Sequence, residues 1–112
     1  MKIETQHYND VVVLELQGEF TAESNKPFQD TVTSIVASGA KGIVLDMSAV
    51  VFIDSVSLEQ LLWLRDYCRE NNRQLKLAGL DEHCSTILRI TRLEPQFDAY
   101  DELAEAVKSI VQ

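Results

Sequence analysis

Apolar and polar residues alternate over residues 2–8, KIETQHY, and a run richer in valine and leucine follows over residues 11–20, VVVLELQGEF. Strict alternation is typical of a half-buried strand, and the Asn9-Asp10 pair between the two runs is typical of a tight hairpin turn. We therefore predict an antiparallel pair of strands at the start of the chain, the second of which ends at Gly18.

A helical pattern comes next, between Thr21 and Gly39. Apolar residues recur there at the spacing of one helix face, at Phe28, Val32, Ile35 and Val36. Pro27 fits only the first turn of such a helix, because proline lacks the N–H that an interior position needs. Gly39 supplies the C-terminal stop.

Strands and helices then alternate to the end of the chain. GIVLDM (42–47) and the apolar run VVFI (50–53) are predicted as buried strand, and a helix is predicted from about Leu58 to Glu70. QLKLAGL (74–80) is a further strand. The remaining elements are a helix within residues 81–93 with Asp81 as its N-cap, a short edge strand after Pro95, and a terminal helix with its apolar stripe at Leu103, Val107, Ile110 and Val111.

This order predicts the fold class. An opening hairpin followed by alternating strands and helices implies right-handed crossovers and neighbouring parallel strands. We expect residues 1–112 to form one small α/β domain, with a mixed, mostly parallel sheet, an N-terminal antiparallel strand pair and about four helices.

Charge and composition narrow the class of partner. The chain has 10 basic and 18 acidic residues, a net charge of −8, which disfavours binding to nucleic acid or to an anionic membrane surface. No apolar run approaches the roughly 18 residues of a membrane span, and MKIETQHYND lacks the apolar region of a signal peptide. We expect a cytoplasmic protein that meets a protein partner and does not insert into a membrane.

Catalytic and metal-binding patterns are absent from the sequence. Cys68 and Cys84 stand far apart without CxxC spacing, so they are interpreted as reduced, apolar helix residues; His7 and His83 have no ligand-spaced neighbours. The chain has no G-x-S-x-G elbow and only 4 glycines from which to build a phosphate-binding loop. We therefore predict a protein without enzymatic activity, metal or cofactor.

One short polar stretch interrupts the apolar pattern, Asp54-Ser55-Val56-Ser57, before Leu58. It lies between a predicted strand and a predicted helix, at the edge of the sheet where open α/β folds place their sites. Local physics favours a plainer interpretation, in which Ser57 is the N-cap of the helix and Asp54 binds backbone amides.

The stretch GIVLDMSAVVFIDSVSLEQLL resembles the signature of STAS domains, named for sulphate transporters and anti-sigma-factor antagonists. That signature is an apolar strand, LDLS, an apolar F-I-D-S, then Ser or Thr, Gly and Leu. Gly18-Glu19-Phe20 is similar to the family's GELD turn, QLKLAGL to its next strand, and ILRITRL to its following helix. The resemblance covers nearly the whole chain and implies a STAS fold.

In the antagonists of this family, the residue two after the Asp is a Ser or Thr that a partner serine kinase phosphorylates. The kinase is also the anti-sigma factor, and phosphorylation blocks its binding. Asp54 and Leu58 match the family pattern on both sides of the turn, so the resemblance places Val56 at the phosphoacceptor position and Ser57 at the glycine. Thr21 stands where GELD has its Asp.

Two hypotheses follow from this departure. In the first, which we favour, the protein keeps the partner-binding role and binds constitutively, because valine has no hydroxyl. In the second, Ser57 or Ser55 is the phosphoacceptor. The resemblance also allows a STAS subunit of a lipid-transporting ABC system or of a stress-sensing complex.

A partner surface is also predicted on the helix after the turn. The leucines Leu58, Leu61, Leu62 and Leu64, with Cys68, share one broad face that we expect against the sheet. Trp63 and Tyr67 lie one turn apart on the other side, near Glu59 and on the side of Val56. We expect this pair to be exposed and to form an interface hot spot.

Overall fold

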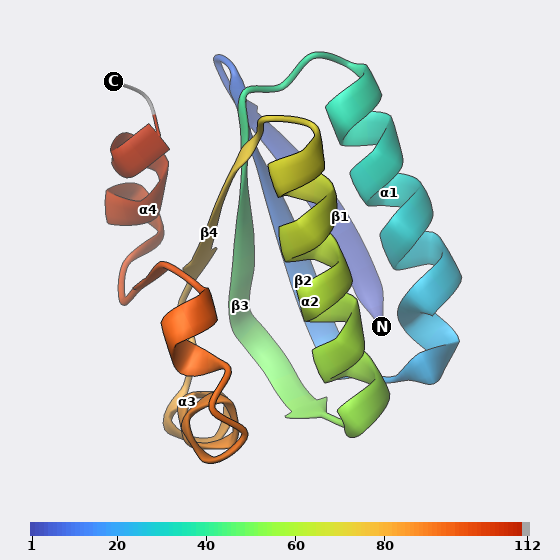
Figure 1. The fold of residues 1–112 in the computed structure, drawn as a ribbon, viewed down its shortest axis with the longest axis vertical. Coiled ribbons are helices and arrows are strands. Elements are labelled where there is room, and N and C mark those ends of the chain that lie inside the picture. Colours follow the sequence, from blue (N-terminus) through green and yellow to red (C-terminus); the bar gives the residue numbers. More distant parts are fainter. Residues whose placement is uncertain (111–112) are drawn as a thin grey trace.

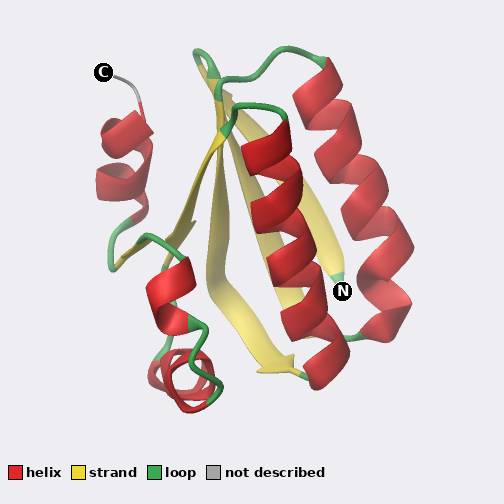
Figure 2. Ribbon diagram, in the orientation of Figure 1, coloured by secondary structure: helices red, strands yellow, loops and turns green. Residues whose placement is uncertain are grey.

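The computed structural model describes residues 1–110, in which 5 strands and 4 α-helices follow the predicted order (Figures 1 and 2). The chain begins with β1 and β2, and β3 runs into the longest helix, α2. In chain order the elements are β1 Lys2–Tyr8, β2 Val11–Phe20, a 3-10 helix Ala22–Ser24, α1 Asn25–Ala37, β3 Gly42–Ile53, α2 Ser55–Glu70, β4 Gln74–Ala78, α3 Glu82–Ile90, a 3-10 helix Glu94–Gln96, β5 Ala99–Tyr100 and α4 Leu103–Ile110.

The strands form one mixed sheet in the order β1-β2-β3-β4-β5. Only the β1–β2 pair is antiparallel, and the other three neighbouring pairs are parallel. Asn9 turns the hairpin with a φ of 57°, a left-handed conformation that asparagine tolerates better than most residues. The predicted fold class, including the N-terminal antiparallel pair, is confirmed.

Helices cover both faces of the sheet. Successive side chains of a strand point to opposite faces, so Val12 and Leu14 of β2 join the core under α1 and α2, while Val11 and Val13 face α4. Figure 1 shows α1 and α2 side by side on one face and α4 across the other. The larger core, under α1 and α2, fixes the position of the first turns of α2, because Leu58 and Leu61 pack into it.

The strand β3 is longer than either of its neighbours. Its pairing with β4 ends at Asp46 and Ala78, while its pairing with β2 continues to Phe20 and Ile53. Two β-bulges, after Glu15 and after Gly18 of β2, each place one extra β3 residue opposite β2. Bulges increase local twist and bend a strand, and Figure 1 shows β3 bending toward the start of α2.

The prediction that the second strand ends at Gly18 is wrong. Gly18 has a φ of 104°, which glycine adopts without strain, and β2 continues through it to Phe20. Because of this extension, β2 and β3 end side by side, at the paired residues Phe20 and Ile53.

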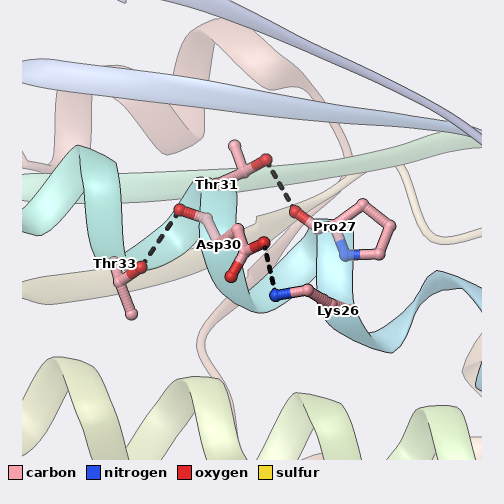
Figure 3. A network of polar contacts seen from close by, with 5 residues as sticks. All are labelled: Lys26, Pro27, Asp30, Thr31 and Thr33. Carbon is pink, nitrogen blue, oxygen red and sulfur yellow. Dashed lines mark hydrogen bonds and ion pairs between the residues drawn. The ribbon is translucent and has the colours of Figure 1, made fainter.

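Helix α1 begins and ends as its sequence predicts. Pro27 is the third helical residue, within the first turn, and Gly39 follows the helix with a φ of 90°. Figure 3 shows the polar bonds on its outer side: Lys26 Nζ lies 3.3 Å from Asp30 Oδ2, and the hydroxyl of Thr31 donates to the carbonyl of Pro27 over 2.7 Å. Phe28 and Val32, on the inner side, are fully buried.

The last third of the chain also follows the prediction. Asp81 is the N-cap of α3, its Oδ1 accepting from the N–H of Cys84 over 2.7 Å. The short strand β5 adds to the edge of β4, and α4 buries Ala106 and Ile110 against the second face of the sheet. Val111, the last residue of the predicted apolar stripe, lies outside the described residues.

Candidate functional site

The turn between β3 and α2 consists of a single residue, Asp54. Its backbone is extended, with φ −115° and ψ −178°, and it is the N-cap of α2. Its Oδ1 accepts from the backbone N–H of Ser57 and lies near the Ser57 hydroxyl, both at 2.8 Å. The bond from the backbone N–H has the larger effect and the bond from the hydroxyl the smaller, and both lower the pKa of Asp54 below its ordinary value. The cap therefore carries a negative charge at neutral pH.

Ser57 does not cap the helix, and α2 does not begin at Leu58. The helix starts three residues earlier, at Ser55, because the Asp54 carboxylate satisfies the free N–H of the first turn. Ser57 is fully buried, and its hydroxyl hydrogen-bonds to the carbonyl oxygen of Phe20 at the end of β2. The side chain therefore connects α2 to β2.

Ser55 and Val56 occupy the first two helical positions of α2. Ser55 is exposed and Val56 is half-buried. Leu58, which precedes the exposed Glu59, packs against the main core as a partly buried residue. Of the two serines in the turn, only Ser55 presents its hydroxyl to solvent.

Thr21 lies at the same end of the sheet as the turn. Phe20 and Ile53 are register partners at the ends of β2 and β3, so Thr21 and Asp54 follow a paired position on adjacent parallel strands. Figure 1 shows the start of α2 and the segment leading into α1 at this one end of the molecule. The structure thus brings together two residues that are more than thirty positions apart in the sequence.

Val51 and Phe52 are exposed, contrary to the prediction of a buried strand. The exposed fraction is 69% for Val51 and 44% for Phe52, whereas Val50 and Ile53 are buried. Their strand is paired with β2 alone, because β4 ends at Ala78 and leaves the other edge of β3 open. The apolar run of β3 is longer than that of β4, which could have suggested that the end of β3 is exposed. The sequence does not show, however, at which residue the pairing of β3 with β4 ends.

Trp63 and Tyr67 are half-buried, so the prediction that they are exposed is wrong. Their rings stack at 5.1 Å, and Trp63 meets Phe28 of α1 edge to face at 6.3 Å. A hydrogen bond of 2.7 Å from Gln29 to Gln60 also joins the two helices. Trp63 thus contacts α1 through Phe28, Tyr67 stacks on Trp63, and both pack against the main core.

The other residues considered from the sequence do not join this site. Cys68 and Cys84 are buried on α2 and α3, where burial raises the pKa of the thiols to about 11 and about 12. Among residues 1–110, no three His, Cys, Asp or Glu side chains are grouped so that they could hold a metal ion. In the same range, no helix has the length and apolar character that crossing a membrane requires.

Comparison with known proteins gives consistent results. A family model described as STAS domain matches residues 2–106. A STAS-domain containing protein of Pseudomonas aeruginosa (strain UCBPP-PA14) is 30% identical over 86 residues, which are 77% of this chain and 84% of that protein.

Two solved structures show the same fold at lower identity. A Thermotoga maritima protein proposed to be an anti-sigma factor antagonist superposes with a TM-score of 0.89 at 24% identity, covering 98% of this chain and 95% of that one. The Bacillus cell fate determinant SpoIIAA, in its phosphorylated form, has a TM-score of 0.74 at 16% identity, covering 97% of this chain and 99% of that one.

Proposed function

This chain belongs to the STAS domain family, and from that premise we propose that it is a non-enzymatic regulatory module that binds a protein partner, in the manner of an anti-sigma-factor antagonist. The proposed partner surface is the end of the sheet where β3 enters α2. It consists of the turn Asp54–Leu58 together with Thr21, Val51, Phe52 and Glu59.

The observation that carries the proposal is the pair of exposed apolar side chains beside a well-ordered turn. Val51 and Phe52 are exposed at an open strand edge, and the hydrogen bonds of Asp54 hold the adjacent helix start in place. Apolar side chains on an ordered backbone bind a partner with little loss of conformational entropy. Such a surface suits a folded protein partner better than a small molecule.

The proposed partner is an anti-sigma factor of the serine-kinase type. Asp54 and Glu59 contribute negative charge beside the apolar pair, and the chain as a whole carries a charge of −8. A complementary surface would therefore combine an apolar pocket with basic side chains. The structural similarity to SpoIIAA, which is an anti-sigma factor antagonist, supports this choice of partner.

The proposed binding is constitutive. In the family register Val56 occupies the phosphoacceptor position, and it has no hydroxyl to modify. The burial of Ser57 and its bond to Phe20 argue against Ser57 as a substitute acceptor, because a kinase needs the hydroxyl in solvent. Ser55, exposed at the first helical position, is the residue that the alternative hypothesis requires.

The proposed partner surface continues along α2, where it involves Glu59, Trp63 and Tyr67. The exposed Glu59 lies one turn from Ser55, so it belongs to the same surface. Trp63 packs on Phe28 of α1 and Tyr67 stacks on Trp63, so we assign the pair a supporting role, in which it holds α1 against α2 beside the surface.

The experiment is affinity capture of the chain at native expression, followed by mass spectrometry of both partner and chain. We expect a serine-kinase anti-sigma factor as the main partner and no phosphate on residues 54–58. Val51→Asp should reduce the recovered partner about tenfold or more, because it places a charge in the apolar contact.

Ile90→Asp is the matched control. Ile90 is as exposed as Val51, at 72% against 69%, but lies on α3, so the control adds the same charge elsewhere and should leave the recovery unchanged. Capture of ABC-transporter subunits in place of a kinase would contradict the proposed pathway. Stoichiometric phosphate on Ser55 or Ser57 would contradict constitutive binding.

A further inference from the structure

A second feature lies at the other end of α2, away from the partner surface. A cavity of about 240 Å³ opens between the last turns of α2, the start of β4 and the segment that leads into β5. Arg69 is fifteen residues beyond Asp54, so at a rise of about 1.5 Å per residue the two ends of α2 are about 22 Å apart. The cavity is therefore separate from the proposed partner surface.

Arginines dominate the wall of this cavity. Three of the five arginines of the chain line it, namely Arg65, Arg69 and Arg73. Arg65 and Arg69 lie one turn apart on α2, where a spacing of four residues places them on the same side of the helix. Arg73 comes from the turn between α2 and β4. In a chain with a net charge of −8, this is a local concentration of positive charge.

Neighbouring carboxylates do not neutralise all three guanidinium groups. Arg65 lies 2.8 Å from the exposed Asp66, and Asp98, which also lines the cavity, lies 2.9 Å from Lys76. In the described part of the chain, Arg69 and Arg73 have no carboxylate within ion-pair distance. Two positive charges thus remain available to a ligand.

Arg73 also holds a buried donor without an acceptor. Its Nη1 donates to the carbonyl of Asn71 over 3.1 Å, but its Nε is buried and has no hydrogen-bond partner among residues 1–110. Buried polar groups are nearly always hydrogen-bonded, because an unmade bond leaves the desolvation of the group uncompensated. Among residues 1–110, Arg73 therefore lines the cavity with no carboxylate partner and no hydrogen bond at its Nε.

We propose that this cavity is a binding site for a small anion that carries a phosphate group. Guanidinium groups donate paired hydrogen bonds that match phosphate oxygens, and two unpaired arginines balance the charge of a phosphate dianion. Leu75, Pro95 and Phe97 form an apolar wall beside the arginines, suited to a carbon skeleton attached to the phosphate. The site would act independently of the partner surface.

The test is a titration of the whole 15N-labelled chain with sodium pyrophosphate, followed by NMR, against sodium chloride at equal ionic strength. We expect saturable shifts of the amides of Arg69, Arg73 and Phe97, and none with chloride. Arg69→Gln should weaken binding about tenfold or more, because it removes a charge-assisted hydrogen bond. Arg73→Gln should have at least the same effect.

Arg89→Gln is the matched control, because Arg89 occupies the last turn of α3 as Arg69 occupies that of α2. Its affinity should stay within about twofold of the unmodified chain. Arg69 is exposed, so Arg69→Gln preserves the test even if Arg73→Gln fails to fold. Shifts that do not saturate, shifts that map elsewhere, or an equal loss in Arg89→Gln would overturn the site.

Discussion

At the scale of single residues, the most informative position is Ser57. Its sequence context, just before a leucine-rich helix, is that of an N-cap, yet the structure buries it completely and bonds its hydroxyl to the carbonyl of Phe20. Asp54 caps the helix instead. Asp54 binds a backbone N–H as its sequence context predicted, but the cap belongs to Asp54 and not to Ser57, because the burial of Ser57 depends on β2, which is distant in sequence.

Replacing Ser57 with alanine should lower the free energy of unfolding by about 1–2 kcal/mol, because the Phe20 carbonyl loses its hydroxyl partner in a buried place. Urea denaturation measures the change. Ser55→Ala, at an exposed position of the same turn, should change the stability by less than about 0.5 kcal/mol. Equal effects of the two substitutions would show that the buried bond contributes nothing.

At the scale of elements, two helices begin in the same way. Asp54 and Asp81 each accept from the backbone N–H of the residue three positions on, Ser57 in α2 and Cys84 in α3. In both aspartates the backbone hydrogen bond is the main reason that the pKa lies below its ordinary value of 3.8. The charged carboxylate also suits the positive end of the helix dipole.

These caps predict the acid side of the stability profile. A carboxylate whose pKa is lower in the folded state stabilises the fold fully above its unfolded pKa, and this contribution is lost as the pH falls through the folded value. Asp54→Asn with Asp81→Asn should therefore be less stable than the unmodified chain at about pH 7, and the difference should shrink below about pH 4.

Urea midpoints between about pH 7 and pH 2.5 measure this difference. Asparagine is itself a good N-cap, so the double variant removes the charge while keeping an acceptor at each helix start. A difference that stays constant over the whole range would show that the two carboxylates do not titrate with folding.

At the scale of the whole molecule, the sheet is held between two cores of unequal size. The larger lies under α1 and α2, and the smaller is closed by α4 through Ala106 and Ile110. Gly42, at the start of β3, lets α4 approach the sheet closely. An added Cβ at Gly42 would lie 2.7 Å from Cγ2 and 2.9 Å from Cδ1 of Ile110.

Gly42 and Ile110 should therefore be energetically coupled. Gly42→Ala should destabilise the fold by about 1–3 kcal/mol through overpacking, and Ile110→Ala by about 2–5 kcal/mol through lost burial. The double variant should be more stable than the sum predicts, because Ile110→Ala removes both clashing atoms. Four urea curves complete the cycle, and strict additivity would contradict the close contact.

The sequence alone determined the order of the elements, the antiparallel start and parallel remainder of the sheet, and the positions of most helix ends. These features depend on local periodicity and on capping residues such as Pro27, Gly39 and Asp81, whose effects act within a few positions along the chain. The cap at Asp54 is likewise local, since its carboxylate accepts from the N–H of Ser57, three residues on.

Only the tertiary structure decided which of these side chains meet solvent. Val51 is exposed because β4 stops short of it, Ser57 is buried because β2 reaches it, and Trp63 is half-covered because α1 lies beside α2. The tertiary structure likewise places Arg65 and Arg69 of α2 beside the segment that leads into β5, so that together they line one cavity. Burial and convergence depend on where strands pair and how far they extend, and these properties belong to residues distant in sequence.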